Sequence, residues 1–173
     1  MKFQIKNKCL RAVGTLTKRK CIHFVGATIV LVVLFSFSSC ELESSKNGDL
    51  DGFWHLESID SLENGQTVDL SKLHIFWGIE HKLIAVRESD YGKSSFYFRF
   101  EQTSDSLKIT EVFLNHGHQD NGEDGGDIPQ DEVTDDLRYY GINAIPDGFV
   151  KEALNGSKMI LKSKTVRLNF KKF

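Results

Sequence analysis

The residues best suited to chemistry lie together in one long segment, residues 115–136, which reads NHGHQDNGEDGGDIPQDEVTDD. It holds eight acidic residues and no lysine or arginine. One residue separates His116 from His118, so in an extended chain both imidazoles lie on one side, a spacing that suits Zn²⁺ or Cu²⁺. Asp120 is a candidate third ligand. The alternative for such a pair is exposed loop surface, because the spacing defines no third ligand.

The same segment is a candidate calcium site, because Ca²⁺ takes roughly six to eight oxygen ligands from flexible acidic loops. The residues from Asp120 through Asp124 to Asp131 resemble the calcium-binding loop of EF-hand proteins. They depart from it at Gly122, and at Asp131, where the EF-hand has a bidentate glutamate; no flanking helices are predicted. The alternatives are a solvated loop extended by its own charges, and an electrostatic lid over the basic residues of 158–167.

Sequence signatures of enzymes are missing from the chain. It has no Gly-x-Ser-x-Gly motif, no glycine-rich phosphate-binding motif and no Cys-x-x-Cys pair. Its clustered carboxylates lie in a segment without predicted structure, whereas acid–base catalysis needs fixed geometry. We therefore predict a protein that is not an enzyme and that has no cofactor.

Charge is distributed unevenly along the 173 residues. The formal net charge is −2, but residues 1–39 contain seven basic residues and no acidic one. The remaining residues include 15 basic and 24 acidic side chains, a formal charge of −9. A general nucleic-acid-binding protein needs a basic surface to neutralise phosphates, so the sequence excludes this class.

The first 39 residues predict a secretion signal, because a basic stretch precedes an uncharged apolar run at 21–37 that small residues follow. The residues Phe37-Ser38-Ser39-Cys40 resemble the lipobox of bacterial lipoproteins, with Phe37 where leucine is usual. The resemblance implies that a signal peptide, residues 1–39, is removed and that Cys40 is acylated. The alternative is a retained signal anchor, because the apolar run approaches the length of a membrane span.

Residues 40–49 are polar and small, which is typical of a flexible tether. The acidic residues behind Cys40 resemble export signals that some Gram-negative bacteria use to display lipoproteins on the outer face of the outer membrane. A polar tether without an export role is the alternative. The lipobox resemblance implies a protein of the outer membrane. Its partner is the membrane itself, in which acyl chains on Cys40 anchor it, since several chains together give stable anchoring.

From Gly52 onward, apolar and polar residues alternate, which predicts half-buried β-strands. The connections are too short for parallel crossovers, so the sheet is antiparallel. An all-β, up-and-down barrel of eight strands removes exposed edges, with a sandwich as the alternative. A short helix is predicted around 134–140, with Thr134 as its N-cap. The predicted strands are 52–60, 73–79, 81–88, 95–102, 106–113, 148–154, 158–163 and 165–172.

Both ends of this region resemble lipocalins. Gly52-Phe53-Trp54 is similar to the Gly-x-Trp motif that opens the first lipocalin strand. Residues 149–170 are similar to the closing strands of the lipocalin-like domains of Gram-negative cell-surface lipoproteins. The resemblance covers residues 50–173, which it identifies as a lipocalin-like domain. In lipocalins the tryptophan packs across the barrel floor near a basic residue of the last strand, which implies that Trp54 lies near Arg167.

The barrel interior is the candidate ligand site, because eight strands enclose space either for side chains alone or for one small ligand. Its predicted lining, for which a plain core is the simpler explanation, is Trp54, Phe76, Phe98, Phe113, Phe170 and Arg167. The leading hypothesis is a lipid-anchored, non-enzymatic envelope domain that binds a small apolar ligand or an envelope protein. The competing hypothesis is a Ca²⁺ or Zn²⁺ site built from His116, His118, Asp120, Asp124 and Asp131.

Overall fold

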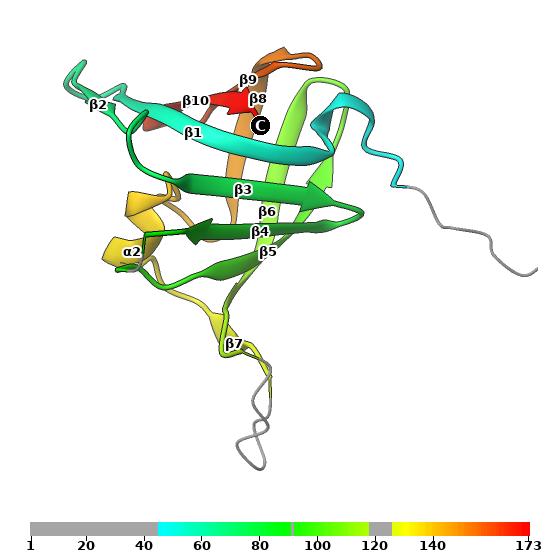
Figure 1. Cartoon of the computed structure of the whole chain (residues 1–173), viewed down its shortest axis with the longest axis vertical. Coiled ribbons are helices and arrows are strands. Elements are labelled where there is room, and N and C mark those ends of the chain that lie inside the picture. The colour runs from blue at the N-terminus through cyan, green and yellow to red at the C-terminus, as the bar shows by residue number, and fades with distance from the viewer. Residues whose placement is uncertain (1–44, 91, 118–125) are drawn as a thin grey trace, which may run out of the picture. The chain divides into compact units, whose positions relative to one another are not determined.

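A computed structural model describes residues 45–90, 92–117 and 126–173 (Figure 1). Two short strands, β2 (Thr67–Asp69) and β7 (Ile128–Gln130), and two short helices, η1 (Gly48–Leu50) and α2 (Asp135–Tyr139), accompany a closed barrel. The eight barrel strands are β1 (Gly52–Ser61), β3 (Ile75–Glu80), β4 (Leu83–Glu88), β5 (Phe96–Gln102), β6 (Ser106–Leu114), β8 (Asp147–Leu154), β9 (Lys158–Lys162) and β10 (Val166–Lys172).

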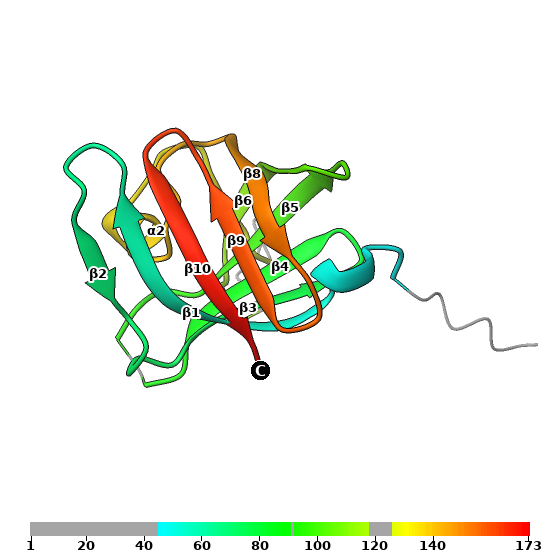
Figure 2. The ribbon, with the colours of Figure 1, turned by 90° about the horizontal axis from the view of Figure 1, so that it is seen from above.

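The barrel strands follow an up-and-down order. Each one pairs antiparallel with the next barrel strand along the chain, and β10 pairs with β1 to close the ring (Figure 2). All eight predicted strands are present, with ends within two residues of the predicted ones. The predicted fold class is therefore confirmed, because alternation of period two and short connections leave few other arrangements.

The two additional strands do not appear in the prediction. β2 pairs with the end of β1, with Ile59 opposite Val68, and β7 pairs with the end of β6, with Phe113 opposite Pro129. Each is three residues long. A three-residue strand is too short to show a recognisable alternation, so its pairing depends on the neighbouring strand rather than on its own sequence.

Helix α2 lies against one end of the barrel (Figure 1). It is the short helix that the sequence predicts around 134–140. Thr134 caps it, since the Thr134 hydroxyl accepts a hydrogen bond of 3.3 Å from the backbone amide of Leu137. Leu137, Tyr140 and Ile142 are fully buried in the hydrophobic core. Residues at and just after α2 therefore close this end of the barrel.

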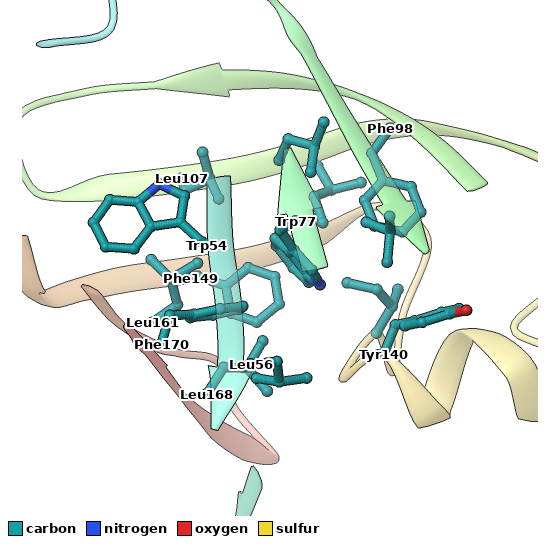
Figure 3. Packing of buried hydrophobic residues seen from close by; sticks show 14 of the residues in the cluster. Trp54, Leu56, Trp77, Phe98, Leu107, Tyr140, Phe149, Leu161, Leu168 and Phe170 are labelled. Atoms are coloured by element: carbon teal, nitrogen blue, oxygen red, sulfur yellow. The ribbon is translucent and has the colours of Figure 1, made fainter. Parts of the chain in front are cut away.

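Large side chains fill the barrel interior (Figure 3). Trp54, Trp77 and Phe98 are completely buried, and the Trp77 ring lies edge-on to Phe98 at 5.8 Å and to Phe170 at 5.1 Å between ring centroids. The close-up shows these aromatic rings interleaved with aliphatic side chains from β1, β6, β9 and β10. The interior resembles an ordinary core, in which alternating apolar residues pack against one another.

Two aromatic residues of the predicted lining lie outside the barrel. Phe76 precedes the inward-facing Trp77 on β3 and packs on the outer surface, against Phe53 at 5.3 Å and Phe173 at 5.4 Å. A β-bulge between β5 and β6 shifts the register, so Val112 rather than Phe113 is buried in the core. Strict alternation from Leu107 places Phe113 inside, and the bulge reverses it.

Candidate functional site

The floor of the barrel is closed around Trp54. Its indole Nε1 donates a 2.8 Å hydrogen bond to the carbonyl oxygen of Leu50 in η1, so the tryptophan is both packed and satisfied. The ammonium of Lys172 lies 4.9 Å from the Trp54 ring centroid, within the range of a cation–π interaction. Lys172 also donates a 3.3 Å hydrogen bond to the carbonyl oxygen of Asp49. η1 and the last strand thus seal the end opposite α2.

Lys172, not Arg167, is the basic residue of the last strand that meets the tryptophan. The prediction for Arg167 is wrong because this residue follows the inward-facing Val166 and points outward. Its guanidinium pairs with Glu152 at 2.7 Å, and this hydrogen bond holds the pKa of the Glu152 carboxyl below its usual range. Glu152 also pairs with Lys162 at 3.4 Å. Arg167 and Lys162 therefore share a carboxylate partner on β8. Residues 118–125 of the acidic segment lie outside the described residues, so the electrostatic-lid interpretation stays a prediction.

Two buried polar atoms near the α2 end have no hydrogen-bond partner in the described part of the chain: Nε1 of Trp77 and the hydroxyl of Tyr140. Leaving such a group unsatisfied costs about 1–3 kcal/mol. Burial also raises the pKa of Tyr140, because its charged form would lose solvation. The rings themselves are completely buried, so these atoms are a local cost of filling the interior with aromatic side chains.

The outer surface carries a continuous row of apolar residues across six strands. Direct cross-strand partners follow one another from β1 to β7 in a single line. Since direct partners share a face, all lie on the outside, over a width of about 24 Å. The outward face of a barrel wall is normally polar, so this row is exceptional. We name it the outer band; it consists of Phe53, Gly78, Ala85, Tyr97, Phe113 and Pro129.

Two shallow hollows lie along the outer band. The larger, about 800 Å³, lies over β1, β3 and β4, and the smaller, about 380 Å³, lies over β4, β5 and β6. Leu83 lines both and is 43% exposed, and Phe53 at one end is 38% exposed. The small residues Gly78 and Ala85 line the larger hollow. A Cβ atom on Gly78 would come within 3.0 Å of the Phe53 ring, so glycine keeps this hollow open.

The acidic segment is described only at its two ends. His118, Asp120 and Asp124 lie outside the described residues, and Asp131 is exposed. The backbone amide of His116 donates a 3.2 Å hydrogen bond to the carboxylate of Asp127, which joins the two ends. Among residues 45–90, 92–117 and 126–173, no group of three or more His, Cys, Asp or Glu side chains could hold a metal ion. The metal hypothesis therefore stays a prediction.

Tyr139 joins α2 to β4 and should make stability sensitive to alkaline pH. Its hydroxyl donates a 3.1 Å hydrogen bond to Glu88, and burial, then this bond, raise the pKa of Tyr139 to about 12. A tyrosine in the unfolded chain has a pKa of about 10, so the folded state keeps the Tyr139 proton up to a higher pH than the unfolded chain does. The resulting stabilisation is fully present below about pH 10 and is lost as the pH rises towards the folded pKa.

We therefore expect Tyr139→Phe to lose less stability than the wild type as the pH rises from about 9 to about 11.5. Melting temperatures measured by circular dichroism across this range check the prediction. Burial, the largest cause of the raised pKa of Tyr140, is present in both proteins, so most of the contribution of Tyr140 cancels in the comparison. Melting curves of the two proteins that decline in parallel with pH would contradict it.

Comparison with known proteins places this architecture in a family. The family described as "Lipocalin-like domain" matches residues 33–173. A crystal structure of a lipocalin-like protein from Bacteroides uniformis is similar, with 19% identity and a TM-score of 0.51, over 73% of this chain and 100% of that chain. An uncharacterized protein from Bacteroides eggerthii is 20% identical, with a TM-score of 0.46, over 71% and 98% of the two chains. A search of curated proteins finds no match. No helix in the described ranges has the length and apolar character to cross a membrane.

Proposed function

The chain belongs to the family of lipocalin-like domains, and from this premise we propose that it is a non-enzymatic binding domain, anchored to the bacterial outer membrane through lipid on Cys40. Its ligands are apolar: a small molecule of the envelope or the apolar surface of an envelope partner. The matched residues begin in the apolar run and include Cys40, so the family extends over the expected lipobox as well as the barrel.

The observation that carries this proposal is the outer band. Completely buried aromatic and aliphatic side chains occupy the barrel interior, and both ends are closed, by η1 with Lys172 and by α2. A ligand inside would have to displace them. The outer band instead presents partly exposed aromatic and aliphatic groups beside two open hollows. Partly exposed apolar rows of this kind are typical of interaction surfaces.

Anchoring is tested by replacing the lipobox cysteine. We expect Cys40→Ala to remove the protein from the outer-membrane fraction and to abolish incorporation of labelled palmitate, because the thiol that is acylated is gone. Cys21→Ala is the matched control, since Cys21 leaves with the signal peptide and its loss should change neither measurement. Retention of Cys40→Ala in the outer membrane would instead support an uncleaved signal anchor.

The binding role is tested on protein purified from its own membrane. Native mass spectrometry should show a co-purifying apolar molecule or envelope protein. Phe53→Ser should reduce the amount of the co-purifying molecule or protein. Val150→Ser, which replaces an exposed valine on β8, should leave this amount unchanged. If neither an apolar molecule nor an envelope protein co-purifies with the wild type or with Val150→Ser, the binding role is refuted, and the proposed anchor is unaffected.

A further inference from the structure

The chain enters the barrel domain at the rim of the larger hollow. Ser45, the first described residue, lines this hollow, and its hydroxyl donates a 2.8 Å hydrogen bond to Asp51. The same hydroxyl accepts a 3.0 Å hydrogen bond from the backbone amide of His81 in the β3–β4 turn. Asn47 adds a 2.6 Å hydrogen bond to the His81 carbonyl oxygen. Residues 45–49, predicted as part of a flexible tether, are thus fastened beside the outer band.

The remaining tether is short. Cys40 precedes Ser45 by five residues, and five residues of extended chain span at most about 18 Å. A lipid on Cys40 therefore lies within about 18 Å of the hollow, less than the width of about 24 Å estimated for the outer band. A bilayer that holds this lipid is brought next to the wall formed by β1, β3 and β4, which lies nearest the viewer in Figure 1.

We propose that the outer band docks on the surface of the bilayer that holds the anchor, with Phe53 and Leu83 inserted at the boundary between headgroups and acyl chains. The inference rests on the proposed lipidation of Cys40. Aromatic side chains favour this boundary, where apolar groups bury about 5–10 Å deep. The guanidinium of Arg87 lies 5.6 Å from the Phe53 ring centroid, and its exposed position suits a lipid phosphate beside the inserted ring.

The tether selects the bilayer over other apolar partners. A few partly exposed side chains give only weak binding to a surface that is free in solution. When two contacts are linked by a short chain, the second becomes intramolecular and its effective concentration reaches about the millimolar range. The bilayer is the one apolar surface that this chain itself holds within reach. A second copy or a protein partner has no such linkage and would need a larger interface of its own.

The test uses the lipidated protein and a single introduced thiol. Cys9 and Cys21 leave with the signal and the thiol of Cys40 is acylated, so an introduced cysteine is the only reactive one. Leu83→Cys, in the outer band's hollow, and Val150→Cys, on β8, are matched, because the native side chains are 43% and 56% exposed. Each is labelled with an environment-sensitive fluorophore and placed in vesicles of phosphatidylethanolamine and phosphatidylglycerol, at less than one protein per vesicle.

We expect iodide in the aqueous phase to quench the label at position 83 at least about threefold less than the label at position 150, because docking places it below the headgroups. Ala85→Cys, on the same face of β4, should behave like position 83. Equal quenching at positions 83 and 150 overturns the proposal. Protection that appears only at several proteins per vesicle shows self-association and also overturns it. Protein that fails to float with the vesicles refutes the anchor itself, whereas floating protein with an unprotected position 83 refutes the docking alone.

Discussion

Replacing Trp77 by alanine is expected to lower the free energy of unfolding by about 3–5 kcal/mol and to create a ligand site in the barrel interior. The ring is completely buried and contacts Phe98 and Phe170 from opposite walls, so its removal leaves a cavity that these neighbours cannot fill. Dry cavities on the order of 150 Å³ in apolar cores bind molecules such as benzene. Urea unfolding measures the first effect, and benzene-induced change in melting temperature measures the second.

Trp77→Phe is the matched control. It removes some volume, but it also removes the indole Nε1, which has no hydrogen-bond partner among the described residues. Because an unsatisfied buried donor costs about 1–3 kcal/mol, its loss offsets much of the lost packing, and the net change should stay below about 1.5 kcal/mol. Neither this variant nor the wild type should bind benzene. Benzene binding by the wild type would show a hollow interior and would return the ligand site to the inside of the barrel.

The filled interior changes where a function should be sought in this lipocalin-like domain. A barrel of eight strands has room for a ligand only if its inward residues leave space, and here Trp54, Trp77 and Phe98 occupy it. A connected row of partly exposed apolar residues, the outer band, remains on the outside of the barrel. In the proposed docking, the outer band and a lipid on Cys40 would act together, because the ordered residues from Ser45 begin at the same face.

The barrel strands could be predicted because each obeys a local rule. Alternation marks the strands, and Thr134 satisfies the first amides of α2 as a cap should. The errors come from features that alternation cannot register. A bulge between β5 and β6 places Val112 rather than Phe113 in the core. The outward Phe76 is covered by Phe53 of β1 and by Phe173, which follows β10. Bulges and cross-strand covering depend on tertiary structure, which a single sequence shows only weakly.

The candidate site was predicted only in part, for similar reasons. Trp54, Phe98 and Phe170 do face the interior, whereas Trp77, the central ring, was not among the predicted residues. A signal for Lys172 did exist: it follows Phe170 by two residues and so shares its inward face. The outer band has no such signal, because Phe53, Tyr97 and Phe113 become neighbours only through the register of separate strand pairs.

Gly141→Ala is expected to lower the free energy of unfolding by about 2–5 kcal/mol, because two costs act at one position. Gly141 has a φ of +89°, a conformation that costs an ordinary residue about 1–2 kcal/mol. A Cβ atom there would also overlap Cδ2 of Leu168, which is fully buried on β10, and overpacking typically costs about 1–3 kcal/mol. The glycine ends α2 with the hydrogen bonds of a Schellman motif, from the Gly141 amide to the Arg138 carbonyl and from the Ile142 amide to the Leu137 carbonyl, both 2.9 Å.

Gly65→Ala separates the two costs. Gly65 has a similar φ of +71°, but no heavy atom lies within 4 Å of the position that its Cβ would take. Its substitution should therefore cost only the conformational part, about 1–2 kcal/mol. The difference between the two variants in urea unfolding then measures the overlap with Leu168, and Leu168→Ala should reduce the penalty of Gly141→Ala in a double-mutant cycle. Equal penalties for the two glycine substitutions would mean that α2 can move away from β10, and that this end of the barrel opens more easily than its packing indicates.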